Sequence, residues 1–237
     1  PDRAKQIQLH YDPEHLKDST DITEKLDDLV LVHPGVGWET KTFPVTYWQK
    51  IIDDLSELGF RIGLIGKHLN DKHSVLDVKC PSNGVDFRDK HTIKGLIALI
   101  SKARILVTND SAPLFMAGAF NNYIVLIPTC KHPDLILPFR NGVDKYFRAA
   151  ALYKKTIEDD EFKDPTMIGG WSMAHLPKGH KIEEYLPETD DVIDKVIDFN
   201  DQWESTHCSI NLKENENEEH GRSKGDWDGC NVVEPYQ

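Results

Sequence analysis

The chain has 237 residues and a mass of 27.1 kDa, with 39% hydrophobic and 29% charged residues, which is the composition of an ordinary globular protein. No stretch approaches the roughly 18 uncharged apolar residues of a membrane-spanning helix, so an integral membrane protein of that kind is excluded. The 40 acidic and 28 basic residues give a net charge of −12. Such a surface repels phosphate backbones, which argues against a general nucleic-acid coat protein.

The cysteines give no sign of a zinc site or a disulfide framework. They are scattered without a C-x-x-C pair, at Cys80, Cys130, Cys208 and Cys230. A chain of this length does not need disulfides to fold, and no secretory signal pattern is visible at its start. We therefore expect a reducing, cytoplasmic environment.

The first 28 residues are polar and charged, without a sustained apolar period, and we expect a lead-in or linker over 1–28. The apolar run at 29–33 then predicts a buried strand. A loop follows, and apolar residues at helical spacing predict a helix that starts near Pro44 and ends at Gly59. This strand, loop and helix form the first structural unit.

The same alternation continues along the chain. Helices are expected from Thr92 and over 111–120, and further apolar runs predict strands at 61–66, 85–87, 105–110 and 123–128. Near-continuous apolar strands that alternate with helices are typical of a parallel sheet covered on both faces. The sequence therefore predicts an α/β fold, a Rossmann-like doubly wound parallel sheet, over 29–204.

Beyond Pro128 the chain is rich in proline and glycine. A last helix is expected over 189–203, because two aspartates stand at its start and Val192, Val196 and Phe199 share one face. From residue 205 to 237 the sequence is acidic, rich in Asn and Gly and almost without aliphatic residues. That composition predicts a disordered acidic tail.

Two loops at the carboxyl ends of predicted strands have unusual composition, and this is where open α/β sheets bind ligands. The first, over 33–44, contains Gly35, Thr40 and Lys41 between a strand and a helix. Backbone N–H groups, a hydroxyl and an ammonium in this position suit a phosphate. The alternative is a plain turn with a solvent-facing lysine.

The second loop places Asp110 and Ser111 between a strand end and a helix start. An aspartate or serine there, followed by Pro113, is also ordinary helix capping. Small residues such as Ala112 would let a ligand approach the helix start. We expect a second candidate anion site here.

Together, these segments resemble glycosyltransferase family 9, which includes the ADP-heptose:lipopolysaccharide heptosyltransferases and has a GT-B architecture of two Rossmann-like domains. The resemblance covers about 29–138, with the 189–203 helix a looser match. It rests on two motifs in the order of the family's carboxyl-terminal domain. The first is LVLVHPGVGWETKTFP, which matches a strand, HPG and Ser/Thr-Lys-x-Trp/Phe-Pro. The second is ILVTNDSAPLFMAGAF, which matches Thr-Asn-Asp-Ser-Gly-Pro-x-His-x-Ala-x-Ala.

The resemblance implies that this part of the chain binds a nucleoside-diphosphate sugar, with no metal and no other cofactor. Thr40 and Lys41 would hold the diphosphate, and Lys41 would stabilise the leaving nucleoside diphosphate, on which charge grows in the transition state. Asp110, Ser111 and the backbone of Ala112 would bind phosphate or sugar. The implied activity is hexosyl or heptosyl transfer.

Three departures from the family pattern concern the donor side. Ala112 stands for the motif's glycine and Phe115 for its histidine, and Thr129 matches a Gly-Pro-Thr loop near the nucleotide whose glycine is replaced by isoleucine. These changes leave the identity of the donor open. Adenine and uridine nucleotides both fit the family.

The family's amino-terminal domain supplies the acceptor site and an acidic general base, and 1–28 are too few residues to form it. Acceptor binding would then need an additional domain or a partner chain. Two alternatives remain: a catalytically silent Rossmann-like binding or assembly module, and a sugar-nucleotide epimerase. The acceptor stays open between lipopolysaccharide core, a modified nucleobase, a protein hydroxyl and a small glycan.

Other residues favour ordinary structural roles. We expect solvated side chains rather than a metal site at His68 and His73, and surface positions for His175 and His180. We expect three aromatic side chains to fill the loop-rich core rather than stack on a base or sugar: Tyr146, Phe147 and Trp171.

Overall fold

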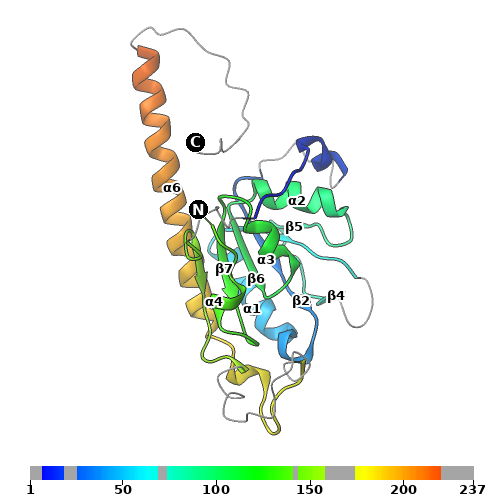
Figure 1. Ribbon diagram of the computed structural model, residues 1–237. Coiled ribbons are helices and arrows are strands. Elements are labelled where there is room, and N and C mark those ends of the chain that lie inside the picture. Colours follow the sequence, from blue (N-terminus) through cyan, green and yellow to red (C-terminus); the bar gives the residue numbers. More distant parts are fainter. Residues whose placement is uncertain (1–6, 19–25, 69–73, 141–143, 158–173, 220–237) are drawn as a thin grey trace, which may run out of the picture. The chain divides into compact units, whose positions relative to one another are not determined.

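A computed structural model of the chain describes residues 7–18, 26–68, 74–140, 144–157 and 174–219, with the backbone alone for 207–219 (Figure 1). The chain divides into two units, Pro1–Asn200 and Asp201–Gln237. Among the described residues, no helix is long and apolar enough to cross a membrane.

The strands are β1 (Leu29–His33), β2 (Gly35–Val36), β3 (Arg61–Leu64), β4 (Ser74–Val75), β5 (Val85–Asp86), β6 (Ile105–Asn109), β7 (Tyr123–Ile127) and β8 (Ala149–Ala151). The α-helices are α1 (Val45–Glu57), α2 (Ile93–Lys102), α3 (Ala112–Ala117), α4 (Pro133–Ile136) and α6 (Thr189–Glu219). Short 3-10 helices are η1 (Pro13–Asp18), η2 (Glu39–Lys41) and η4 (Ile182–Glu184).

Within the described residues, six strands form one sheet in the order β5-β3-β1-β6-β7-β8, and every neighbouring pair in it is parallel. From β1 the chain first builds outward through β3 and β5, then returns to add β6, β7 and β8 on the other side. The two directions meet between β1 and β6. Because crossovers are right-handed, this reversal puts α1 on one face of the sheet and α2 and α3 on the other. The Rossmann-like doubly wound fold is confirmed.

The reversal between β1 and β6 positions the ligand-binding edge. In open α/β sheets, ligands occupy the crevice outside the carboxyl ends of the strands at the point where the strand order reverses. Here that point lies between His33 at the end of β1 and Asn109 at the end of β6, and residues of the two strands pair up to His33 and Thr108. Both predicted loops begin there.

Alternate residues of each strand point to opposite faces of the sheet, and apolar side chains are buried on both faces. One cluster joins the sheet to α2 and α3 through fully buried Leu31, Leu106 and Leu126. α1 buries Trp48, Ile51, Ile52 and Leu55. α1 ends where expected, because Gly59 adopts a φ of 91°, which L side chains rarely adopt.

The lead-in contributes more than a linker would. Leu16 of η1 and Leu26 pack against the α2 side of the core, and Tyr11 makes an edge contact with Phe120 at 5.4 Å between ring centres. The sequence pattern misses this because two isolated leucines in a polar segment produce no periodicity. Residues 1–6 and 19–25 of the lead-in lie outside the described part.

The elements that differ from the expectation include β8, α3 and α6. β8 adds a sixth parallel strand in the proline- and glycine-rich region, formed by three alanines that carry little strand signal. α3 is shorter than predicted and comprises only Ala112–Ala117. α6 continues to Glu219 instead of ending near Trp203, so the first part of the expected tail is helical. Residues 220–237 lie outside the described part.

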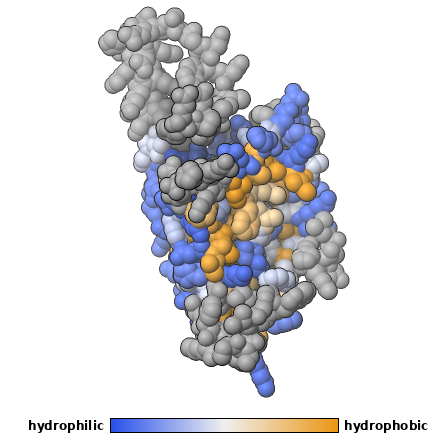
Figure 2. All heavy atoms as spheres, in the orientation of Figure 1, coloured by the Kyte–Doolittle hydropathy of each residue, from blue (hydrophilic) through white to orange (hydrophobic). Residues whose placement is uncertain are grey.

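Apolar side chains gather on the surface over α2, α3 and α4 (Figure 2). The exposed ones are Ile93 on α2, Phe115 on α3 and Leu135 on α4, with 72%, 41% and 64% of their surface accessible. Phe115 is the residue that replaces the histidine of the family motif. The replacement therefore adds to a surface that is already apolar.

Candidate functional site

The two predicted loops meet at the carboxyl ends of β1 and β6. The Asn109 side chain, which is 2% exposed, donates from Nδ2 to the carbonyl oxygens of Gly35 and Lys41, at 2.9 and 2.8 Å. These bonds join the end of β6 to both ends of the loop that follows β1. The residues that the sequence suggested for one site are therefore brought together.

Lys41 and Asp110 form an ion pair across the site. The Lys41 Nζ lies 2.6 Å from Asp110 Oδ2, with 21% and 10% of the two side chains exposed. The same Nζ lies 4.8 Å from the centre of the Trp38 ring, in a cation–π arrangement. Lys41 thus does not extend into solvent as it would in a plain turn. It is held at the sheet edge with part of its surface accessible.

The hydroxyls of Thr40 and Thr129 face the protein instead of the solvent. Thr40 is fully buried, and its Oγ1 accepts a hydrogen bond from Cys130 Sγ at 2.9 Å. Thr129 is 2% exposed and donates through its hydroxyl to the carbonyl oxygen of Thr40. In this structure both residues support the loop that carries Lys41, whereas the resemblance implied direct contact with the donor. Burial also raises the pKa of the Cys130 thiol, which keeps it protonated at neutral pH.

Ser111 belongs to a polar cluster with the histidine at the end of β1. Its Oγ lies 3.1 Å from His33 Nδ1 and 3.1 Å from Thr108 Oγ1, and it donates to the carbonyl oxygen of Asn109 at 3.2 Å. Burial lowers the pKa of His33 to about 4, partly opposed by the neighbouring Asn109 side chain. The imidazole is therefore neutral at pH 7 and adds no charge to the site.

α3 is too short to attract an anion strongly through its helix dipole, although the sequence predicted an anion site at its start. It comprises six residues, and the Ser111 side chain does not cap it. A helix this short leaves most of its N–H groups outside a regular ladder. Ala112 at its start is an exposed residue, and Lys41 carries the positive charge of the site.

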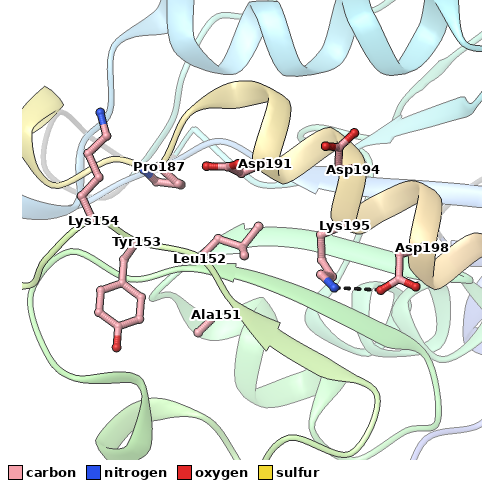
Figure 3. A pocket seen from close by; sticks show the side chains of 9 residues that line it. All are labelled: Ala151, Leu152, Tyr153, Lys154, Pro187, Asp191, Asp194, Lys195 and Asp198. Atoms are coloured by element: carbon pink, nitrogen blue, oxygen red, sulfur yellow. Dashed lines mark hydrogen bonds and ion pairs between the residues drawn. The ribbon is translucent and has the colours of Figure 1, made fainter.

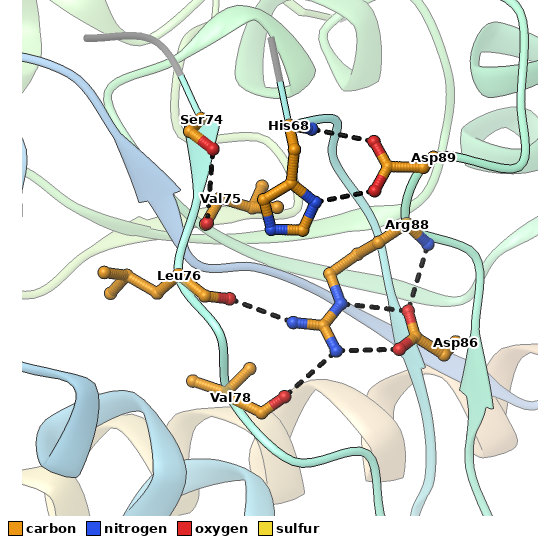
Figure 4. Close-up of polar contacts among 8 residues, drawn as sticks. All are labelled: His68, Ser74, Val75, Leu76, Val78, Asp86, Arg88 and Asp89. Carbon is orange, nitrogen blue, oxygen red and sulfur yellow. Dashed lines mark hydrogen bonds and ion pairs between the residues drawn. The ribbon is translucent and has the colours of Figure 1, made fainter. Parts of the chain in front are cut away.

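Other candidates lie elsewhere. His68 pairs with Asp89, with 2.6 Å between Nδ1 and Oδ2, beyond the ends of β3 and β5 (Figure 4).

The remaining candidates were expected at the surface or in the loop-rich core. His175 is exposed and His180 half-buried, while His73 and Trp171 lie outside the described residues. Tyr146 is 47% exposed and donates to Asp134, so it does not fill the core as expected, and Phe147 is half-buried. No group of three His, Cys, Asp or Glu side chains that could hold a metal occurs among the residues with described positions.

Open pockets border the described part of the domain, and two of them are lined by neither Lys41 nor Asp110. One, of about 510 Å³, lies between the end of β8 and α6, where Lys195 pairs with Asp198 at 2.7 Å (Figure 3). The other, of about 790 Å³, borders the first loop at Gly37, Glu39 and Thr42. The second pocket therefore adjoins the candidate site, whereas the first shares no lining residue with it.

The sequence suggested the charged residues of the site but gave no role to Asn109 or His33. Both were visible as parts of the two motifs, yet a single sequence does not show that their side chains meet. Their shared signal is position, because each ends a parallel strand at the reversal point.

Comparison with known proteins identifies the family. The model of "Glycosyltransferase family 9 (heptosyltransferase)" matches residues 1–158, which is two thirds of the chain. The chain belongs to glycosyltransferase family 9. The match includes the lead-in and both motif loops of this family 9 chain. A search among curated proteins finds no match.

Solved structures agree in fold. A family 9 glycosyltransferase from Veillonella parvula DSM 2008 is 15% identical with a TM-score of 0.54, over 81% of this chain and 53% of that one. The ADP-heptose lps heptosyltransferase II of E. coli is 14% identical with a TM-score of 0.51, over 83% and 54%. The dodecameric iron-containing glycosyltransferase TibC from enterotoxigenic E. coli H10407 is 14% identical with a TM-score of 0.51, over 82% and 50%.

The family 9 chain therefore spans about half the length of these structures. Its Rossmann-like sheet corresponds to one half of a GT-B heptosyltransferase. At this level of identity the likeness concerns the fold. The donor, the acceptor and the activity are the subject of the proposal that follows.

Proposed function

We propose that this chain is the donor-binding half of a glycosyltransferase that transfers a sugar from a nucleoside diphosphate to an acceptor. The observation that carries the proposal is Lys41, whose ammonium is held by Asp110 at the point where the strand order reverses. An ammonium in this position suits the diphosphate of a sugar donor. Family membership supports the same reaction class.

An adenosine diphosphate heptose is the first donor to test. TibC, described as a heptosyltransferase, was solved in complex with ADP-D-β-D-heptose, and this chain matches it with a TM-score of 0.53 and 14% identity. Phe115 and Ala112 leave the sugar and the base open, so uridine and guanosine diphosphate sugars belong in the same test. The choice among them depends on the side chains around the bound nucleotide.

Lys41 would act on the leaving group. As the glycosidic bond to the diphosphate breaks, negative charge grows on the departing phosphate, and a nearby ammonium stabilises that state more than the ground state. We propose that Lys41 takes this role without a bound metal. The acceptor and its general base would come from a further domain or a partner chain. We propose a cytoplasmic setting for this reaction, because the cysteines of the sequence are scattered without a C-x-x-C pair.

The test is a thermal-shift and calorimetric titration with ADP, UDP, GDP and their sugars. A ligand at 100 times its dissociation constant stabilises the native state by about 2.7 kcal/mol. We expect one nucleotide class to stabilise the chain, and Lys41→Ala to weaken its binding so that this stabilisation is sharply reduced. Lys50→Ala is the matched control, because Lys50 lies on α1 in an exposed pair with Asp54 and should leave binding unchanged.

A second candidate is a catalytically silent binding or assembly module. Phe115 in place of the histidine, on an apolar surface, favours this alternative. It predicts no shift with any nucleotide and no sugar transfer. Transfer detected with the 237-residue chain, alone or combined with an acceptor domain, would exclude it.

A further inference from the structure

Two consecutive residues, Asn109 and Asp110, hold the backbone and the side-chain ammonium of Lys41. Asn109 Nδ2 donates to the backbone carbonyl of Lys41 at 2.8 Å, and Asp110 Oδ2 pairs with its ammonium at 2.6 Å. Asn109 also donates to the carbonyl of Gly35 at 2.9 Å, so it ties down the start of the same loop. One dipeptide at the end of β6 thus fixes the position of the lysine.

We propose that Asn109 is a positioning residue for the site: its amide fixes the loop from Gly35 to Lys41, and Asp110 then directs the Lys41 ammonium. The nature of the ligand, a nucleoside diphosphate, rests on the proposed function. The positioning itself rests on the bonds within this chain. Asp110 in this arrangement acts on Lys41 rather than on phosphate, which its negative charge would repel.

The two contacts of Asn109, with the carbonyls of Gly35 and Lys41, require a side chain that donates two hydrogen bonds, as an amide does. Both groups that face Nδ2 are carbonyl oxygens, which accept hydrogen bonds and cannot donate them. An NH₂ group supplies two donors to them from one atom. An aspartate of the same size would set a carboxylate against two carbonyl oxygens in a site that is 2% exposed, which is unfavourable.

Positioning from the sheet has a direct consequence for binding. A lysine side chain has many rotamers, and holding it in one of them before the ligand arrives removes an entropic cost of binding. Asn109 ends β6, an inner strand paired with β1 and β7 on its two sides. The loop therefore takes its position from an inner strand that is paired on both sides.

A matched control is available on the same sheet. Asn122 is also buried, at 7% exposure, and its Nδ2 donates to the carbonyl of Ile100 at 3.1 Å. It lies just before β7, at the opposite edge from Lys41. Replacing either asparagine with alanine removes buried hydrogen bonds, but only Asn109 contacts the loop.

The first test measures Lys41 without any ligand. Acetylation by an N-hydroxysuccinimide ester is followed by mass spectrometry, with exposed Lys50 as the internal reference. A lysine released from its ion pair reacts faster, so we expect Asn109→Ala and Asp110→Asn each to raise the rate at Lys41 about fivefold. Asn122→Ala should leave that rate unchanged. An unchanged rate in Asn109→Ala would overturn the proposal.

The second test measures coupling in ADP binding. We expect Asn109→Ala to weaken ADP binding about tenfold in the wild-type background and to have no further effect in Lys41→Ala. Equal losses in both backgrounds would show that Asn109 does not act through Lys41. If the wild-type chain binds no ADP, UDP or GDP, the proposed function fails, while acetylation still decides the role of Asn109.

A readout on the wild-type chain covers the case in which Asn109→Ala does not fold. Both Nδ2 protons of Asn109 donate to carbonyl oxygens and the residue is 2% exposed, so both should exchange with solvent much more slowly than those of an exposed amide such as Gln8 or Asn121. Nitrogen-15 NMR of the wild-type side chain measures this. Exchange of the Asn109 protons at the rate of exposed amides would contradict the proposal.

Discussion

Gly35 has no room for a side chain. A Cβ at this position would lie 2.5 Å from His33 Cε1 and 2.9 Å from Asn109 Oδ1. At Gly37, two residues along the same loop, the nearest atom would be Lys41 Cβ at 3.9 Å, an ordinary contact. The two glycines of one loop therefore have different reasons to be glycine.

We expect Gly35→Ala to destabilise the fold by about 1–3 kcal/mol, because overpacking displaces the side chains around it. The same variant should weaken nucleotide binding, since Asn109 is one of the displaced groups. Urea unfolding and ADP titration measure the two effects. Gly37→Ala should leave both nearly unchanged, and equal destabilisation by the two variants would refute the explanation.

His33 makes stability depend on pH. In the folded chain its pKa is about 4, whereas the ordinary value is 6.5. Between these values, the unfolded chain binds a proton that the native chain does not, so stability falls as the pH drops from 6.5 to 4. The full effect is about 3 kcal/mol.

The prediction is checked by urea unfolding between pH 7 and 4.5. The wild-type chain should lose stability over this range more steeply than His33→Asn, because the variant lacks the group that titrates. The His33 Cε1 proton should show no titration in NMR spectra between pH 7 and 5. Titration of that proton near pH 6 would contradict a buried neutral imidazole.

At the scale of elements, Arg88 holds the segment that follows β4. Arg88 donates to Asp86 and to the backbone carbonyls of Leu76 and Val78, at 2.9 and 3.0 Å for the carbonyls (Figure 4). The pairing lowers the pKa of Asp86. Because β4 pairs with β2 at Gly35, this arginine fixes the segment that covers the start of the candidate site.

Arg88→Ala should cost about 2–3 kcal/mol and loosen the segment from β4 to Val78, since several hydrogen bonds of a charged donor are lost together. Amide hydrogen exchange measures the loosening residue by residue. Lys50→Ala, which removes an exposed pair on α1, should not change exchange in this segment. Unchanged protection of Leu76 and Val78 in Arg88→Ala would disprove the role of the arginine.

At the scale of the molecule, the first turns of α6 complete the domain. Val192, Val196 and Phe199 are buried, and the Phe199 ring lies 4.9 Å from that of Tyr123 at the start of β7. The last helix of the first unit therefore covers a strand seventy-six positions earlier in the chain. This packing joins the start of α6 to the sheet.

We expect Phe199→Ala to destabilise the first unit by about 3 kcal/mol, the cost of removing a buried aromatic side chain. Asp194→Ala, an exposed position on the same helix, should have little effect. Denaturant unfolding followed by tryptophan fluorescence separates the two, because Trp48 is fully buried in the first unit. Equal effects of the two variants would show that α6 does not pack as described.

The class of fold and the two loops of the site could be predicted from the amino-acid sequence alone. Long apolar strands alternating with amphipathic helices record burial on both faces, and this signal is local in the chain. The motifs around Lys41 and Asp110 are likewise continuous stretches of sequence. Their order and spacing predict the family of the chain, and the family model confirmed this prediction.

The contacts between those residues become visible only in the folded chain. There Lys41 pairs with Asp110, the hydroxyls of Thr40 and Thr129 are buried, and Asn109 lies against two carbonyls of the first loop. The folded chain also contains β8, which the sequence did not predict because three alanines have little strand propensity. The reason is physical: hydrogen bonds between residues about seventy positions apart depend on the strand order, and a single sequence carries no local signal of that order.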